Sequence, residues 1–224
     1  MIQVTNWSVT WPDGTRAVKD LSFQAAAGER VALIGGNGAG KSSLIRSLVG
    51  VLPGEGQAKL AGIPVERKNY RELRKKVGVV FQNPDDQLFL PRIRDNVAFG
   101  LKNLGTGPEE TARRVRNILQ QFNIPELEDR LAMKLSGGEK RLAALASVMV
   151  MEPEILLLDE PTAFLDPKAR RNLIRILNRL PQTMLIATHD LAFAAEVCPR
   201  AVILKSGTLI TEMKTEEIDE DIIS

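Results

Sequence analysis

The pattern of apolar and polar residues predicts a protein built on β-sheets. Residues 4–11 and 21–27 alternate apolar and polar side chains, which is typical of strands that bury one face. Residues 29–36, 155–159 and 183–190 hold short, nearly continuous apolar runs, which are typical of parallel strands covered on both faces. We therefore predict an α/β fold in which an N-terminal antiparallel β part accompanies a mostly parallel sheet.

Helical periodicity begins between these strands. Residues 41–49 form one predicted helix, and residues 167–180 form another, which has a proline in its first turn. From 93 to 130 the pattern is helical, and residues 115–122 are strongly amphipathic. Further strands are expected at 58–65 and 75–81, together with a closing hairpin at 201–212.

These elements divide into a core and an insertion. The strand, helix and strand over 155–190 predict a right-handed crossover, the unit from which parallel sheets are built. The helical stretch interrupts the series of core strands. We therefore predict an α/β core of residues 1–92 and 151–224, with a helical subdomain inserted at 93–150. A length of 224 residues fits one large domain with such an insertion.

Composition indicates an ordinary globular protein in a reducing compartment. Of the residues, 44% are apolar and 26% are charged, and the single cysteine, Cys198, excludes an intramolecular disulfide. The first residues lack the pattern of a signal peptide, and no run of about eighteen apolar residues occurs. We therefore expect any membrane role to come through a partner.

Charge is unevenly distributed, although the formal net charge is only +2. Basic residues cluster at 66–76, 112–116 and 168–179, and their helical spacing favours solvated faces over phosphate contacts. Two tryptophans and one tyrosine provide no aromatic ladder for stacked bases, so no nucleic acid is expected as a partner. Residues 212–224 hold six acidic residues and one lysine, and they are expected to form a solvated terminus.

The strongest chemical signal is a phosphate-binding loop that follows the strand at 29–36. It matches the pattern G-x-x-x-x-G-K-[ST] with Gly35, Gly36, Asn37, Gly38, Ala39, Gly40, Lys41 and Ser42. Glycines let backbone N–H groups turn toward phosphate oxygens, and the N-terminus of the following helix adds partial positive charge. Lys41 is expected to reach the β- and γ-phosphates of ATP, and Ser42 to ligate Mg²⁺. A dinucleotide-type glycine turn is the alternative; the lysine–serine ending disfavours it and indicates a P-loop NTPase.

Acidic and imidazole side chains follow two of the apolar strands. Asp159 ends the strand at 155–159, Glu160 is the next residue, and His189, the only histidine, comes just after the apolar run at 183–187. Ligands bind at the carboxyl edge of parallel sheets, so we expect Asp159 to hold Mg²⁺ and Glu160 to polarise the water that attacks the γ-phosphate. His189 is expected to contact the γ-phosphate and to orient Glu160. The alternatives are two solvated acids at a strand end and a structural histidine.

A third motif identifies the family. The sequence Leu-Ser-Gly-Gly-Glu at 135–139 opens a helix and resembles the signature motif of ATP-binding-cassette (ABC) ATPases. Physically, Ser136, Gly137 and Gly138 offer a hydroxyl, exposed N–H groups and a helix N-terminus, which together suit an anion. The resemblance implies that this turn binds the γ-phosphate of ATP held by a second subunit in a head-to-tail dimer. A serine-capped helix with Glu139 in its first turn is the alternative interpretation.

The resemblance extends over residues 2–211 and implies further site residues. Gln82 matches the glutamine that senses Mg²⁺ and the γ-phosphate, and Asp166 matches the loop that crosses the dimer. Trp11 stands where the family places an aromatic residue against adenine, and an ordinary strand aromatic is its alternative. Ser43, which follows Ser42, is also expected to take part in binding the nucleotide. The sequence departs from the family pattern at three positions, namely Phe164 in place of glycine, Glu139 in place of glutamine and Leu142 in place of arginine.

Residues 81–89, Phe-Gln-Asn-Pro-Asp-Asp-Gln-Leu-Phe, resemble the ATPases of energy-coupling-factor (ECF) importers, including the cobalt and nickel systems. This resemblance implies uptake of a vitamin or a transition-metal ion. It implies a second ATP-binding subunit, identical or different, and a segment that docks a helix of a transmembrane coupling subunit. It also implies a substrate-binding membrane subunit and a peripheral location at the cytoplasmic face of the cell membrane. A simple turn over Asn-Pro-Asp-Asp is the alternative.

Three other functions are weighed against this one. Another class of ABC importer would share the same motifs. A non-transport ABC ATPase of DNA repair or translation usually carries long coiled-coil insertions or two tandem cassettes, and this sequence has neither. A module that binds ATP without hydrolysing it would not require Lys41, Glu160 and His189 together.

Overall fold

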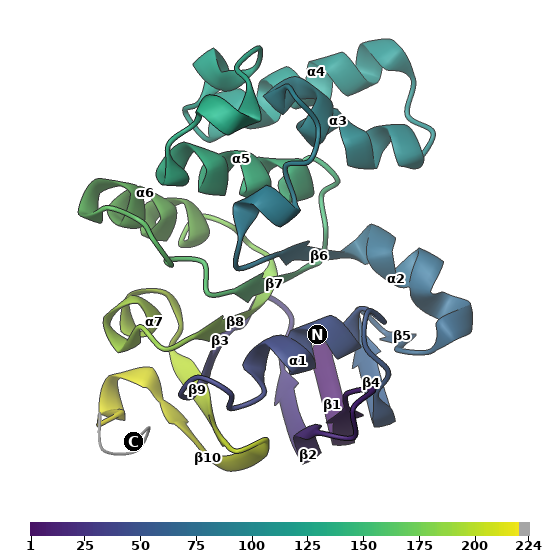
Figure 1. Cartoon of the computed structure of the whole chain (residues 1–224), viewed down its shortest axis with the longest axis vertical. Coiled ribbons are helices and arrows are strands. Elements are labelled where there is room, and N and C mark those ends of the chain that lie inside the picture. The colour runs from purple at the N-terminus through teal and green to yellow at the C-terminus, as the bar shows by residue number, and fades with distance from the viewer. Residues whose placement is uncertain (220–224) are drawn as a thin grey trace. The chain divides into compact units, whose positions relative to one another are not determined.

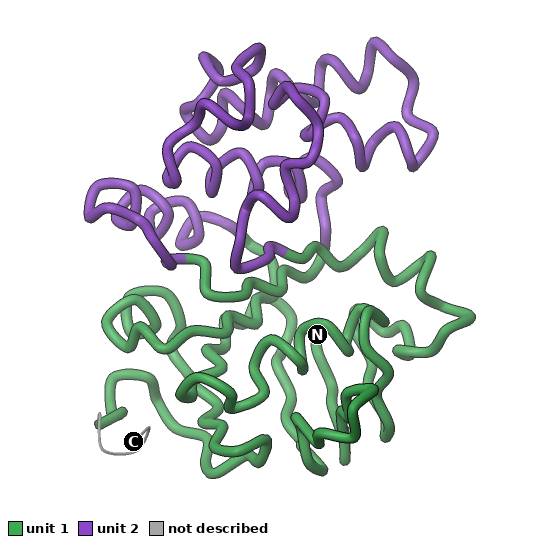
Figure 2. Tube along the Cα trace, viewed as in Figure 1, with its two compact units in different colours: residues 1–79, 154–161, 181–224 green, residues 80–153, 162–180 purple. Residues whose placement is uncertain are grey.

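The computed structural model describes residues 1–219 of the chain, which divide into two compact units (Figures 1 and 2). The first unit contains Met1–Val79, Glu154–Pro161 and the chain from Pro181 onward. The second contains Val80–Pro153 and Thr162–Leu180. The second unit therefore includes the predicted helical insertion at 93–150 and extends beyond it on both sides.

The first unit begins with an antiparallel sheet of strand order β2-β1-β4-β5. Its strands are β1 (Ile2–Thr10), β2 (Arg16–Ala25), β4 (Glu55–Leu60) and β5 (Ile63–Pro64). Val4 on β1 pairs with Phe23 on one side and with Ala58 on the other, and all three side chains are buried. The alternating pattern of the N-terminal segments thus corresponds to strands with one face in the core.

A second sheet of six strands has the order β10-β9-β3-β8-β7-β6. Its strands are β3 (Arg30–Ile34), β6 (Val77–Val80), β7 (Ile155–Asp159), β8 (Thr183–Thr188), β9 (Arg200–Lys205) and β10 (Thr208–Lys214). The pairs β7–β8, β8–β3 and β3–β9 are parallel, whereas β10 runs antiparallel to β9. Every residue of β7 and β8 is buried, as their continuous apolar pattern predicts. The predicted α/β fold is confirmed.

Two predicted strands differ from the observed elements. The predicted strand at 58–65 is a hairpin, because Ala61 and Gly62 both adopt positive φ and turn β4 into β5. The predicted strand at 75–81 starts two residues late, because Lys75 and Lys76 form the last turn of helix α2 (Tyr70–Lys76). Three basic residues in that turn face the negative end of the helix dipole, which stabilises the helix there.

Two indole groups attach helix α1 (Lys41–Leu48) to the N-terminal sheet. The Trp7 Nε1–H donates to Ser47 Oγ at 2.9 Å, and the Trp11 Nε1–H donates to Ser43 Oγ at 3.1 Å. Ser43 and Ser47 lie four residues apart and so share one face of the helix. Helix α7 (Leu191–Val197) completes the regular α-helices of this unit among the described residues.

The second unit consists mainly of helices. These are α3 (Ile93–Asn103), α4 (Pro108–Gln121), α5 (Gly137–Met149) and α6 (Pro167–Leu177). Helix α6 was expected in the α/β core, but it packs with the helices of the insertion. A Cβ atom on Gly138 would lie 2.7 Å from the Ala169 side chain, so the glycine allows α5 and α6 to approach closely.

The acidic C-terminal segment begins within regular structure. Residues Glu212 to Lys214 belong to β10, and Thr215–Glu217 form a short 3-10 helix. Residues 220–224 of the predicted solvated terminus lie outside the described residues. Over residues 1–219, none of the helices combines the length and the apolar character needed to cross a bilayer.

Candidate active site

The phosphate-binding loop connects β3 to α1 in the first unit, as predicted. Gly38 and Gly40 adopt φ values of +77° and +102°, which L-residues rarely adopt. A Cβ atom on Gly40 would lie 2.2 Å from the Ala17 carbonyl oxygen, and one on Gly35 would lie 2.4 Å from that of Leu204. Neighbouring backbone thus excludes any side chain at these two positions.

Lys41 is the first residue of α1, and its side chain is buried. Its ammonium Nζ donates to the carbonyl oxygens of Gly35 at 2.7 Å and Gly36 at 3.1 Å. It also lies 3.5 Å from Glu160 Oε1, and both side chains are more than nine-tenths buried. The loop thus places a buried positive charge between its own carbonyl groups and a carboxylate.

Ser42 and Asp159 meet at the carboxyl edge of the parallel sheet. The Ser42 hydroxyl donates to Asp159 Oδ1 at 2.9 Å. Burial raises the pKa of Asp159, the Ser42 hydrogen bond partly opposes this, and the charge of Glu160 adds to it. Two oxygen groups at this spacing suit a hard divalent cation, which completes its shell with phosphate oxygens and water. Within residues 1–219 no cluster of three or more His, Cys, Asp or Glu side chains could hold a metal by itself.

Glu160 and His189 lie at the same edge. Glu160 adopts φ +43°, a strained value for this residue type, and its N–H donates to the Ala187 carbonyl of β8 at 2.8 Å. Its carboxylate is buried, and its Oε2 lies 3.0 Å from His189 Nδ1. The His189 side chain is 65% exposed, so it connects the buried carboxylate to the surface. The predicted set Lys41, Ser42, Asp159, Glu160 and His189 is therefore brought together.

The predicted residues Gln82, Ser136, Gly137, Gly138 and Asp166 belong to the second unit and form separate features there. Ser136 caps α5 through a reciprocal pair, because its Oγ accepts from the Glu139 N–H while Glu139 Oε2 accepts from the Ser136 N–H at 2.7 Å. Asp166 caps α6 by accepting from the N–H groups of Lys168 and Ala169. Gln82 follows β6, and its side chain is exposed. The serine-cap interpretation therefore describes the local geometry at Ser136, whereas an anion there stays a prediction.

Trp11 and Ser43 contact each other rather than standing apart. The indole N–H of Trp11 donates a hydrogen bond to the Ser43 hydroxyl, and the Ser43 side chain is buried. The ring of Trp11 is partly exposed beside α1, so a contact with adenine stays a prediction.

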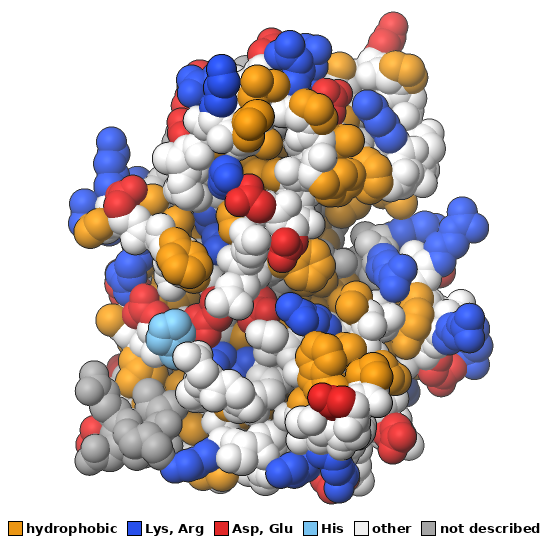
Figure 3. All heavy atoms as spheres, viewed as in Figure 1, with side chains coloured by type: hydrophobic (Ala, Val, Ile, Leu, Met, Phe, Trp, Pro, Cys, Tyr) orange, Lys and Arg blue, Asp and Glu red, His pale blue; other side chains and the backbone are white. Residues whose placement is uncertain are grey.

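The segment 81–89 is only partly available to a partner. Leu88 is buried, so the apolar side chain at this position of the segment offers no surface for the docking that the resemblance implies. Asp85 pairs with Lys140 of α5 at 2.6 Å. Phe89, in contrast, is 58% exposed and packs edge to face on Phe99 of α3, with ring centroids 4.9 Å apart. Hydrophobic side chains gather on this face of the second unit, in the region of α3 (Figure 3).

Sequence inspection missed one buried charged residue near these elements. Arg141 of α5 is almost fully buried, and it donates to the carbonyl oxygens of Phe81 and Gln82. The sequence signal for its burial is that a basic residue stands within the largely apolar helix at 139–151.

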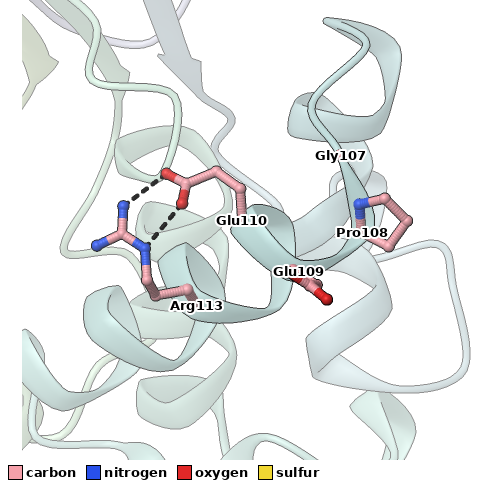
Figure 4. Close-up of a pocket in the computed structure, with 5 residues that line it drawn as sticks. All are labelled: Gly107, Pro108, Glu109, Glu110 and Arg113. Carbon is pink, nitrogen blue, oxygen red and sulfur yellow. Dashed lines mark hydrogen bonds and ion pairs between the residues drawn. The ribbon is translucent and has the colours of Figure 1, made fainter.

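A surface hollow at the start of α4 contains none of the predicted site residues (Figure 4). It is lined by Gly107, Pro108, Glu109, Glu110 and Arg113. Glu110 and Arg113 pair through two hydrogen bonds of 2.7 Å, so their charges are already compensated.

Comparison with known sequences gives consistent results. The family model described as ABC transporter matches residues 18–163. A putative ABC transporter ATP-binding protein of Streptomyces coelicolor is 44% identical over 99% of this chain and 86% of its own length. The energy-coupling factor transporter ATP-binding protein EcfA of Methanothermobacter thermautotrophicus is 43% identical over 99% of this chain and 73% of its own length.

Solved structures agree with these sequences. The protein cbiO1 of Clostridium perfringens, part of the ABC transporter complex cbiONQ, has a TM-score of 0.86 at 36% identity, covering 96% of this chain and 89% of its own. The ATP-binding cassette MJ0796, as a dimer in a post-hydrolysis state bound to ADP and Pi, has a TM-score of 0.86 at 25% identity, covering 96% and 99%.

Proposed function

This chain belongs to the ABC transporter ATP-binding family, a family of ATPases, and we propose that it powers import through membrane subunits in an ECF-type complex. The observation that carries the proposal is the cluster at the sheet edge, where Lys41, Glu160 and His189 lie beside the Ser42–Asp159 pair. The similarity of the whole chain to EcfA and cbiO1 supports assignment to the ECF type.

In the proposed reaction, each residue of the cluster has a separate role. The loop N–H groups and Lys41 bind the β- and γ-phosphates of ATP. Ser42 and Asp159 fit Mg²⁺, because both offer oxygen and they lie 2.9 Å apart. When bound, Mg²⁺ neutralises phosphate charge. Glu160 polarises the attacking water, and His189 holds the carboxylate from its exposed side at 3.0 Å.

We propose that hydrolysis takes place in a head-to-tail dimer. Ser136, Gly137, Gly138 and Asp166 of one subunit would contact the ATP of the other, and Gln82 would contact Mg²⁺ and the γ-phosphate. Trp11 and Ser43 would lie at the adenine and phosphate side of α1. Support comes from the dimeric cassette MJ0796, which has the same fold. The second subunit is a copy of this chain or a related ATPase.

The membrane partner is proposed to be a transmembrane coupling subunit that works with a substrate-binding membrane subunit. The complex would take up a vitamin or a transition-metal ion such as cobalt or nickel. The chain would then lie at the cytoplasmic face of the membrane, held there by its partners. Phe89 and Phe99 provide the exposed apolar contact that a helix of the coupling subunit requires.

A pull-down from detergent-solubilised membranes of the source cell tests this assignment. Phe89→Glu should abolish capture of the coupling subunit and leave ATP affinity unchanged, because the phosphate-binding loop lies in the other unit. Met133→Glu is the matched control, since Met133 is 82% exposed in the same unit and lies outside residues 81–89. Normal capture by Phe89→Glu would reject the docking role. Capture of subunits unrelated to ECF transport would favour another class of ABC importer.

A further inference from the structure

One buried charge connects the segment that carries Gln82 to helix α5. Arg141 is only 1% exposed. Its Nη1 donates to the Phe81 carbonyl and its Nη2 to the Gln82 carbonyl, each at 2.6 Å. The short distances and the charged donor make these strong hydrogen bonds. The backbone at Gln82 is thus held from inside the unit, while the Gln82 side chain is exposed.

Gln87 provides a second connection between the same two elements. Its amide Nε2 donates to the Ala144 carbonyl at 2.8 Å and to Ser147 Oγ at 3.0 Å, and its Oε1 accepts from the Phe81 N–H at 3.4 Å. Phe81 is therefore bonded through its N–H to Gln87 and through its carbonyl to Arg141. The turn at 81–87 is fastened to α5 at both of its ends.

The same helix starts at the Ser136 turn. Arg141 lies five residues after Ser136, a little more than one helical turn further along α5. The two proposed phosphate sensors of this unit, Gln82 and the Ser136 turn, are therefore attached to the first two turns of one helix. A shift of this part of α5 must displace both.

A buried arginine is a poor choice for stability alone. Desolvation of a guanidinium group offsets much of what its hydrogen bonds return, and apolar residues of similar volume often serve equally well. The hydrogen bonds of Arg141 instead fix the orientation of the backbone at Phe81 and Gln82, and thereby the direction in which the Gln82 side chain extends.

We propose that Arg141, assisted by Gln87, is a positioning residue that holds Gln82 and the Ser136 turn in one rigid arrangement for ATP hydrolysis. The inference rests on the proposed role of Gln82. A displacement of about 1 Å at a reacting centre can cost on the order of 10²-fold in rate. Loss of Arg141 should therefore lower the turnover number rather than the affinity for ATP.

The test compares Arg141→Met with Arg114→Met. Arg114 is a half-buried arginine of the same unit that donates to the Val150 carbonyl at 2.7 Å, outside the 81–87 turn. Arg141→Met should lower kcat by roughly 10- to 100-fold and raise the Mg²⁺ concentration needed for half-maximal turnover. The KM for ATP should stay near that of the unmodified chain, and Arg114→Met should match the unmodified chain in all three quantities.

A double-mutant cycle separates positioning from a purely structural role. In a Gln82→Ala background, Arg141→Met should cause a much smaller further loss of kcat than in the unmodified chain, because the side chain through which it mainly acts is already absent and only its hold on the Ser136 turn remains to be lost. Losses that add would overturn the inference, as would normal kcat in Arg141→Met. Gln87→Leu should also lower kcat, by a smaller factor than Arg141→Met. If Arg141→Met does not fold, the same cycle is measured with Gln87→Leu in its place.

The same cycle distinguishes the inference from the proposed function. Normal turnover in Gln82→Ala would overturn the proposed role of Gln82 together with the inference. Impaired turnover in Gln82→Ala with normal turnover in both Arg141→Met and Gln87→Leu would overturn the inference alone.

Discussion

Phe164 adopts a backbone conformation that favours glycine, and its replacement by glycine should stabilise the fold. Its φ is +61°, and its side chain is 92% exposed. The left-handed conformation costs an L-residue about 1–2 kcal/mol. Glycine avoids this cost but adds about 0.5–1 kcal/mol of chain entropy in the unfolded state. The ring is so exposed that its removal sacrifices only about 0.2 kcal/mol of burial. The net gain is about 0.5 kcal/mol.

The assay is urea and thermal unfolding of Phe164→Gly beside Phe164→Ala. Alanine also removes the ring but keeps a Cβ atom, so it keeps the strain. We expect the glycine variant to exceed the alanine variant by about 0.5–1 kcal/mol, or about 1–4 °C in Tm for a chain of this size. Equal stability of the two variants, or a more stable alanine variant, would show that residue 164 does not carry the strain inferred from its φ.

Three further predictions concern the sheet edge. Lys41→Ala should abolish ATP binding measured by calorimetry, because the buried charge beside the loop is lost, and normal affinity would refute its role. Glu160→Gln should bind ATP and form ATP-dependent dimers in gel filtration, yet hydrolyse it about 10²- to 10⁴-fold more slowly; unchanged turnover would exclude Glu160 as the group that polarises water. Asp159→Asn should lose Mg²⁺-dependent turnover but unfold at a higher temperature at neutral pH. Burial raises the pKa of Asp159 above 3.8, so its ionisation destabilises the fold as pH rises through the folded-state value, and the advantage of the asparagine variant should vanish below pH 3.8. An advantage that persists there would contradict this account.

The sheet edge was predictable because its motifs are local and its strands are parallel. The Gly35–Ser42 loop has a fixed spacing of glycines, and its backbone geometry follows from them. Asp159 ends β7 and His189 follows the neighbouring β8, and in a parallel sheet the carboxyl ends of neighbouring strands share one edge. That rule predicts proximity between residues that lie far apart in the sequence.

Other features depend on tertiary contacts that a linear pattern does not contain. Leu88 and Phe89 are adjacent apolar residues, yet one is buried and the other is exposed. The boundary between helix α2 and strand β6, which falls between Lys76 and Val77, depends on how both elements pack in the folded chain. Arg141 is a basic residue in a helix that already has an apolar face, and only the carbonyl groups of the 81–87 turn explain its burial.

The two indole groups that attach α1 to the N-terminal sheet also provide an optical signal. Trp7 and Trp11 are the only tryptophans in the sequence, and both donate to serines of the helix that begins with Lys41. Trp7 is 2% exposed, whereas Trp11 is partly exposed, so the two should emit at different wavelengths. Tryptophan emission of the unlabelled chain, excited selectively over its single tyrosine, therefore originates entirely from side chains bonded to the helix that follows the phosphate-binding loop. A nucleotide titration followed by emission would report on that helix alone, with no contribution from the helical unit.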